Sequence, residues 1–351
     1  MQIKSSITSF LSTNVARQLD LVNPSTFTKI SEIRLRANKP MLIKKDGQEH
    51  YILDLALTKI NRLPREPSNA HENVSESGSI FVRLNEFPRK SNACAIQSAE
   101  HSANAYTPTQ DDIYETMERI SQHSFYAFEA ELAHGYITLP GGHRVGVAGQ
   151  AVIENGTVRS WKHISAINIR VAHSVIGCAN EVMPYIANAS PLHTLIIAPP
   201  GCGKTTLLRD MIRQLSNSGY TIGLADERSE VAGCFNGIPQ NDVGMRTDVI
   251  DSCPKAIAME MLLRAMSPDI IAVDELGGYA DIRAVETIAN AGIKLLCTAH
   301  ASEVMDLKKN PAFEKLLQMG IFERYVVLGE RYKIMGVYDA NMELVSKQQI
   351  R

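Results

Sequence analysis

The sequence lacks the long apolar segments of a secreted or membrane-spanning protein. No apolar run reaches the roughly 18 residues of a transmembrane helix, and the first 22 residues interrupt their apolar positions with Ser, Thr and charges, unlike a signal peptide. The six cysteines are scattered, without a C-x-x-C pair or the histidine spacing of a metal site. We therefore expect a cytoplasmic protein with reduced cysteines.

The chain also lacks a strong net charge and is poor in aromatic residues. Its 36 Lys and Arg against 38 Asp and Glu leave a formal net charge of -2, and aromatic residues make up 6%. Neither value supports a basic, base-stacking surface, so we expect no nucleic-acid partner. The composition, 44% hydrophobic and 21% charged, is that of a globular protein, and 351 residues fit two domains of roughly 150 residues each.

The first half, residues 1–172, is predicted to be an antiparallel α+β domain. Alternating apolar positions and two short apolar runs around Asp46-Gly47 predict a β-hairpin within residues 32–63. A helical stretch over 112–134 precedes strands joined by a Pro-Gly turn and by Asn155-Gly156, a dipeptide typical of tight hairpins.

Residues 64–110 interrupt this domain with a different composition. They are rich in Ser, Asn, Glu, Pro and His, and carry one strand-like patch at 80–84. Such a segment has too few large apolar residues to build a core, so we interpret it as a mostly disordered insertion. A charged docking tail is the alternative interpretation.

The second half, residues 173–351, alternates short apolar runs with helix-forming stretches. That order predicts a mainly parallel sheet with helices covering it. The predicted fold class is therefore α/β, with an antiparallel α+β domain followed by a domain built on a mainly parallel sheet.

Residues 198–206, APPGCGKTT, form a strand–loop–helix phosphate-binding motif, with Ala198 in place of the usual first glycine. Backbone amides and the helix start can cradle a polyphosphate, and Lys204 is predicted to bridge its β and γ phosphates. Thr205 is predicted to ligate Mg²⁺ and Thr206 to bind the α phosphate. The cofactors expected are ATP and Mg²⁺, and the predicted nucleotide-binding residues are Pro200, Gly201, Cys202, Gly203, Lys204, Thr205, Thr206 and, farther along the chain, Asp226. A glycine-rich turn by itself can be only a turn.

An apolar strand, IIAV, ends in Asp274 and Glu275. Ligands bind at the C-terminal ends of parallel strands, so these acids are expected near the loop. We predict that Asp274 holds a magnesium water and that Glu275 polarises the water that attacks the γ phosphate. Two acids at a strand end are also common in solvent-facing turns. The phosphate-binding loop is the feature that favours a catalytic role for this pair.

Two further strand ends carry polar groups toward the same edge. Asp226 and Glu227 end one strand and are predicted to support Mg²⁺ or the water, with helix capping as the alternative. His300 ends another and is predicted to sense the γ phosphate, although a lone histidine there is often a surface or cap residue. Together these residues predict a nucleoside triphosphatase.

Several longer strings add a resemblance. EIRLRANKPM, GYITLPGGHRVGVAGQAV, INIRVAHSVIGCA, APPGCGKTTLLRD, LADERSEVAG and AVDELGG, in this order, resemble the stage III sporulation protein AA family of spore-forming bacteria. The acid pair, His300 and the preceding β-rich domain are similar to the type II and type IV secretion ATPases. The resemblance begins near residue 31 and continues to the C-terminus, except for the insertion.

The resemblance implies a RecA-like ATPase that works as a hexamer in the mother cell, peripheral to the membrane. Its implied partners are the membrane proteins of the channel that connects the mother cell to the forespore. By the resemblance, Asp226 and Glu227 match an acidic box and His300 a histidine box. In those relatives, arginines of the first domain complete the site between subunits; Arg144 and Arg170 are the candidates, unless they are ordinary exposed strand arginines.

Two other functions remain open at this point. One is a nucleotide-gated scaffold with little turnover, although Glu275 favours hydrolysis. The other is a RecA-like nucleic-acid translocase. Residues alone cannot separate a motor from a scaffold, because both need the same phosphate-binding loop.

Overall fold

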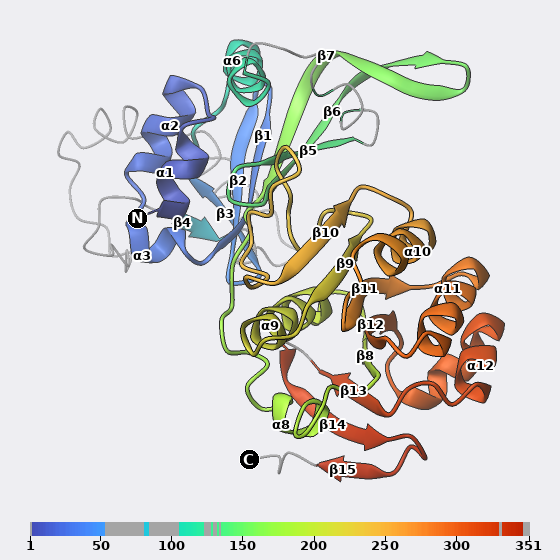
Figure 1. Ribbon diagram of the computed structural model, residues 1–351. Coiled ribbons are helices and arrows are strands. Elements are labelled where there is room, and N and C mark those ends of the chain that lie inside the picture. The colour runs from blue at the N-terminus through green and yellow to red at the C-terminus, as the bar shows by residue number, and fades with distance from the viewer. Residues whose placement is uncertain are drawn as a thin grey trace, which may run out of the picture. The chain divides into compact units, whose positions relative to one another are not determined.

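The computed structural model describes residues 2–52, 81–83, 105–122, 128, 132, 135–329 and 332–346. The chain forms two compact units, Met1–His173 and Ser174–Arg351. Each is built around its own sheet, one antiparallel and one mainly parallel, as Figure 1 shows. The predicted fold class is thereby confirmed.

The first unit is an antiparallel sheet with short helices. The helices are α1 (Gln2–Thr8), α2 (Thr13–Asp20), α3 (Pro24–Phe27) and α6 (Gln110–Ile120). The strands, in sheet order, are β4 (Phe81–Arg83), β3 (Gln48–Ile52), β2 (Lys39–Lys45), β1 (Ile30–Arg36), β7 (Thr157–Arg170), β6 (His143–Glu154) and β5 (Tyr136–Leu139).

Alternation along these strands buries one set of side chains. Ile33 pairs with Ile43 and Ile169, and Leu35 pairs with Ile167, so apolar residues meet across the strands and all five are at most 1% exposed. The alternate positions, including Arg34 and Arg170, are not buried. Period-2 patterning in the sequence thus places the core of this unit.

The hairpin predicted within 32–63 is confirmed, because β2 and β3 pair on either side of Asp46-Gly47, and β1 adds a third strand to it. Two other predictions for this unit need correction. The helix expected over 112–134 ends at Ile120. The insertion expected over 64–110 contains β4, within its strand-like patch, and ordered residues from Ala105 onward; its remaining residues lie outside the described ones.

Specific contacts hold residues 105–112 in place. Tyr106 is 8% exposed, and its amide donates to the carbonyl of Ile52 at 2.8 Å while its carbonyl accepts from Met41 at 2.9 Å. Thr109 and Asp112 form a capping box at the start of α6. These residues extend the sheet and begin the helix.

The second unit has an eight-stranded sheet. Its order is β10 (Thr247–Asp251), β9 (Ile222–Asp226), β11 (Ile270–Leu276), β12 (Lys294–His300), β8 (Thr194–Ala198), β13 (Arg324–Leu328), β14 (Ile334–Asp339) and β15 (Leu344–Ser346). The first six strands are parallel, and β14 and β15 are antiparallel. The edge strand β10 and, at the other side of the sheet, β13, β14 and β15 were not predicted.

Helices cover both faces of this sheet, so most residues of its central strands are buried and apolar, and polar residues follow at their C-terminal ends. The helices are α8 (Met183–Ile186), α9 (Lys204–Asn217), α10 (Lys255–Ala265), α11 (Tyr279–Asn290), a 3₁₀ turn at Val304–Lys309 and α12 (Pro311–Gln318). One core forms beneath α9 and another beneath α10, α11 and α12. The C-terminal ends of the parallel strands therefore lie along one edge of the sheet, next to the start of α9.

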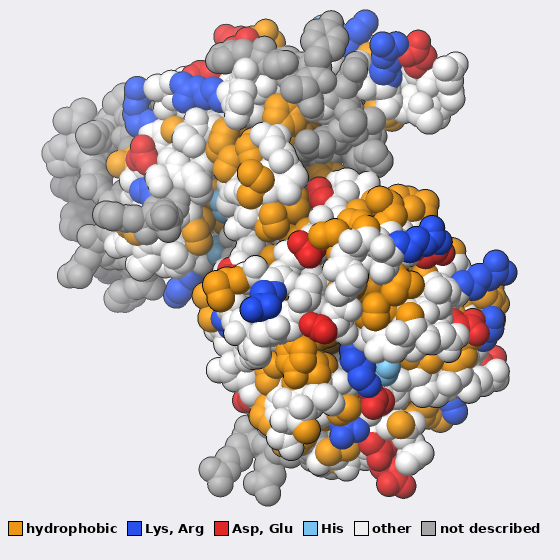
Figure 2. Space-filling view, in the orientation of Figure 1, with side chains coloured by type: hydrophobic (Ala, Val, Ile, Leu, Met, Phe, Trp, Pro, Cys, Tyr) orange, Lys and Arg blue, Asp and Glu red, His pale blue; other side chains and the backbone are white. Residues whose placement is uncertain are grey.

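Helix α10 is apolar on two sides. Met259 and Leu262 are buried, whereas Ile257 is 55% and Met261 is 49% exposed. Figure 2 shows hydrophobic side chains gathered over this helix. Within the described residues, no helix combines the length and hydrophobicity needed to cross a membrane.

Candidate nucleotide-binding site

The phosphate-binding loop connects β8 to α9. Gly201 and Gly203 have φ angles of 78° and 95°, in the left-handed region that glycine adopts without strain. Ala198 is the last, fully buried residue of β8 and is not among the residues with positive φ. An alanine therefore fits there, and the backbone freedom is needed at the two later glycines.

Tyr332, which was not predicted from the sequence, also holds the phosphate-binding loop in place. Its amide donates to the carbonyl of Cys202 at 2.8 Å. A Cβ added to Gly203 would lie 2.9 Å from Cδ1 of the Tyr332 ring, too close for contact. Gly203 is thus required by its backbone conformation and by this packing.

Lys204 begins α9 and is 7% exposed. Its ammonium donates to the carbonyls of Ala198 at 2.9 Å and Pro199 at 3.1 Å, and lies 2.8 Å from Nδ1 of His300. Loss of hydration lowers the pKa of Lys204, while nearby carboxylates act in the opposite direction. The Lys204 ammonium is held next to the phosphate-binding loop, where it could contact a bound polyphosphate.

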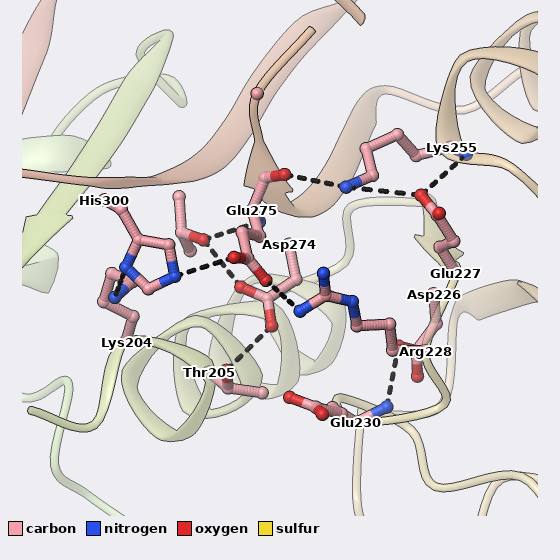
Figure 3. A network of polar contacts seen from close by, with 12 residues as sticks. Lys204, Thr205, Asp226, Glu227, Arg228, Glu230, Lys255, Asp274, Glu275 and His300 are labelled. Atoms are coloured by element: carbon pink, nitrogen blue, oxygen red, sulfur yellow. Dashed lines mark hydrogen bonds and ion pairs between the residues drawn. The ribbon is translucent and has the colours of Figure 1, made fainter. Parts of the chain in front are cut away.

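His300 connects this cation to an acid. Its Nε2 lies 2.7 Å from Oε1 of Glu275. A lysine ammonium only donates and a carboxylate only accepts, so the network assigns a neutral ring with Nδ1 accepting and Nε2 donating. Figure 3 shows the ring between the two side chains.

Asp274 is bound by two hydroxyl groups. Thr205 donates to its Oδ2 at 2.7 Å and Thr298 to its Oδ1 at 2.6 Å. Loss of hydration raises the pKa of Asp274, and these hydrogen bonds oppose the rise. A carboxylate held in this way is suited to a cation, because buried charges are paired or coordinate metals.

Mg²⁺ fits this pair of oxygens. It takes few protein ligands in nucleotide sites and completes its octahedron with water and phosphate oxygens. The Thr205 hydroxyl and the Asp274 carboxylate face each other at the start of α9, next to Lys204. Across the described part of the chain, no cluster of three His, Cys, Asp or Glu could hold a metal without such outside ligands.

Glu275 lies at a β-bulge. Between the pairs Val273–Cys297 and Leu276–Ala299, β11 has one residue more than β12, and Glu275 has a φ of 58°. Its amide donates to the Thr298 hydroxyl at 2.8 Å. Its carboxylate accepts from Arg228 at 2.6 Å as well as from His300. The bulge changes the direction of the Glu275 side chain. Its carboxylate therefore contacts His300 and does not point to the opposite face of the sheet.

The two acids at the end of β9 behave differently from each other. Asp226 is 1% exposed and accepts the amides of Glu230, Val231 and Ala232 at 2.8–3.1 Å. Burial raises its pKa to about 6. Its oxygens are thus engaged by amides of its own loop, and its predicted role at the nucleotide site remains a prediction.

Glu227, the next residue, remains at the strand edge. Its carboxylate lies 3.2 Å from the ammonium of Lys255, the first residue of α10. Glu227 and Glu275 both line an open cavity of about 460 Å³, together with Arg228, Lys255 and His300. A substrate therefore has access to this edge.

Arg144 and Arg170, predicted from the resemblance, lie in the first unit. In the strand register, Arg144 of β6 lies opposite Arg170 of β7, and Arg170 also lies opposite Glu32 of β1. The guanidinium of Arg144 lies 3.9 Å from the centre of the Tyr136 ring, and Arg170 is exposed. All other predicted site residues belong to the second unit, so a role for these two arginines remains a prediction.

Sequence reasoning missed four residues of this site: Thr298, Arg228, Lys255 and Tyr332. A threonine in the apolar strand LLCTAH and an arginine directly after the acids at 226 and 227 were signals that could have been followed. Lys255 at a helix start and Tyr332 in a loop gave no such signal.

Comparison with known proteins shows the family of this chain. Residues 90–345 match the family described as "Sporulation stage III, protein AA". Stage III sporulation protein AA of Bacillus subtilis is 41% identical over 252 residues, which cover 69% of this chain and 82% of that protein. The chain belongs to the sporulation stage III protein AA family.

More distant proteins share part of the chain or the fold. Protein SEEDLING PLASTID DEVELOPMENT 1 of Arabidopsis thaliana is 28% identical over 177 residues, 46% of this chain and 25% of that protein. The crystal structure of the ATPase DotB of Yersinia pseudotuberculosis is 14% identical, with a TM-score of 0.51 over 91% of this chain and 76% of that one. The second comparison shows that this chain shares the fold of the ATPase DotB.

Proposed function

We propose that this chain is a Mg²⁺-dependent ATPase that powers assembly of, or transport through, a membrane channel complex between mother cell and forespore. The observation that carries the proposal is the 2.7 Å contact between the Thr205 hydroxyl and Asp274, at the start of the helix that Lys204 begins. A hydroxyl, a carboxylate and an ammonium gathered at a glycine-rich loop form a site for a metal-bound polyphosphate.

Each side chain then has a distinct task. Lys204 and the amides of residues 201–206 bind the phosphates, with Thr206 next to the α phosphate. Thr205 and Asp274 hold Mg²⁺, which neutralises the charge that develops on the phosphate oxygens. Glu275 accepts the proton of the attacking water, and His300 keeps its carboxylate oriented toward Lys204.

The assembly part of the proposal rests on family membership and fold. We propose a homo-oligomer, a hexamer as in the secretion ATPases that the sequence resembles, held at the mother-cell membrane through partner proteins. The exposed apolar side of α10 is a surface of the kind that association between copies buries.

Steady-state phosphate release tests the catalytic part. The full chain should release phosphate from ATP when Mg²⁺ is present, and Lys204→Ala should neither bind ATP nor release phosphate. The matched control is Lys309→Ala, because Lys309 is an exposed lysine paired with Asp306. Normal ATP affinity in Lys204→Ala would place the nucleotide elsewhere.

A second function has a specific observation in its favour. Both carboxylate oxygens of Glu275 are already engaged, by Arg228 and His300. A glutamate held in this way activates water slowly, as in a nucleotide-gated scaffold that binds ATP with little turnover. Phosphate release no faster than the buffer blank, with ATP bound normally, would favour the scaffold.

A further inference from the structure

Glu275 has a backbone that its neighbours must hold in place. A φ of 58° lies in the left-handed region, which is unfavourable for a non-glycine residue, and such conformations persist where the surroundings fix them. The Thr298 hydroxyl accepts the Glu275 amide. The Glu275 carbonyl therefore needs its own partner if the peptide on its other side is to stay fixed.

That partner is Lys255. Its ammonium donates to the Glu275 carbonyl at 2.7 Å, and its side chain is 12% exposed. It also forms the ion pair with Glu227, whose carboxylate accepts the Lys255 amide at 3.3 Å. Figure 3 shows Lys255 between Glu227 and the Glu275 main chain, on the side away from His300.

These contacts of Lys255 connect three elements of the second unit. Glu227 follows β9, Lys255 begins α10, and Glu275 belongs to β11. The lysine does not contact the Glu275 carboxylate in any of the hydrogen bonds described, so it does not hold the reacting group directly. It instead secures the peptide from which that carboxylate extends.

We infer that Lys255 is a positioning residue for Glu275, fixing its left-handed backbone so that the carboxylate faces His300 and the phosphate-binding loop. The inference rests on the proposed function for its catalytic consequence. Displacing a reacting group by about 1 Å can cost on the order of a hundredfold in rate, so a main-chain anchor matters to turnover without contributing to ATP affinity.

The test compares Lys255→Met, Lys255→Arg and Lys294→Met in the full chain. Lys294 is the matched control, because it is a part-buried lysine paired with Glu323 at the opposite end of β12. Lys255→Met should lower kcat at least about tenfold with the Kd for ATP within about threefold, and Lys255→Arg should recover part of the rate. A parental kcat in Lys255→Met, or an equal loss in Lys294→Met, would overturn the inference.

Amide hydrogen exchange separates this inference from the proposed function. Without ATP, the Glu275 amide should exchange faster in Lys255→Met than in the parent or in Lys294→Met, because its hydrogen bond to Thr298 opens more often. If the parent has no turnover but this difference appears, the ATPase proposal fails and the anchoring role stands. Unchanged exchange at Glu275 would refute the anchoring role whether or not the parent hydrolyses ATP.

Discussion

The Nε2 atom of His300 lies 2.7 Å from the Glu275 carboxylate. Through its other nitrogen, the same ring meets the Lys204 ammonium at 2.8 Å. One neutral imidazole thus connects the cation of the phosphate-binding loop to the acid proposed to activate water. A change at the γ phosphate that moves Lys204 would be transmitted to Glu275 along this path.

Glu275→Gln should bind ATP and Mg²⁺ but hydrolyse ATP at least about a hundredfold more slowly, since the amide keeps the shape and loses the proton acceptor. Its oxygen can still accept from His300, so the ring should stay in place. ATP binding by fluorescence and phosphate release at saturation measure the two effects separately.

Glu260→Gln is the control for that experiment, because Glu260 forms an exposed pair with Arg264 on α10. It should behave as the parent. Hydrolysis by Glu275→Gln within a few-fold of the parent would assign water activation to Glu227, which lines the same cavity.

Arg170→Ala should lower turnover strongly while leaving folding and most ATP affinity intact. The reason is that a cation supplied from outside the loop can stabilise the charge on the γ phosphate by roughly a thousandfold or more in rate. If that cation comes from a neighbouring copy, turnover per protomer should also rise with protein concentration until the rings are filled.

Mixing Arg170→Ala with Lys204→Ala subunits tests whether the arginine acts between copies. Each variant lacks a different half of a shared site, so some interfaces in mixed rings regain both halves and activity returns. Rings shown to be mixed, yet inactive, would rule out an arginine that acts on its neighbour.

Acid should destabilise the first unit through His143. This side chain is 2% exposed, and its Nδ1 accepts the Ala172 amide at 3.0 Å. Burial, and then the neighbouring His173, lower the pKa of His143 to about 4. Below the unfolded value of about 6.5 the unfolded chain binds a proton that the folded one refuses, so stability falls by up to about 3 kcal/mol between pH 6.5 and 4.

Urea unfolding followed by Trp161 fluorescence measures this loss, because the single tryptophan lies on β7 of the same unit. His143→Gln keeps an acceptor for Ala172 and has no charge to gain. Its unfolding free energy should change less with pH over this range. The same pH dependence in the variant and the parent would contradict the assignment.

The phosphate-binding loop and the strand before Asp274 could be predicted from the sequence. Gly201 and Gly203 are recognisable because only glycine takes their φ angles cheaply, and Lys204 and Thr205 follow at a fixed spacing in a helix start. The apolar run before Asp274 identifies a buried strand whose end faces the loop. Such features depend on neighbours in the chain, so the sequence carries them.

Other features depended on which segments meet in space. Adjacent acids at the end of β9 look alike, yet Asp226 accepts amides of its own loop whereas Glu227 meets Lys255. The bulge that turns Glu275 arises from its pairing with β12. Lys255 and Thr298 are 20 and 23 residues from Glu275, and they reach its main chain because α10, β11 and β12 pack together. The sequence alone thus determined the phosphate-binding loop and its acids, and only the tertiary structure decided how Glu275 is held, because long-range packing sets the direction of each side chain at a strand end.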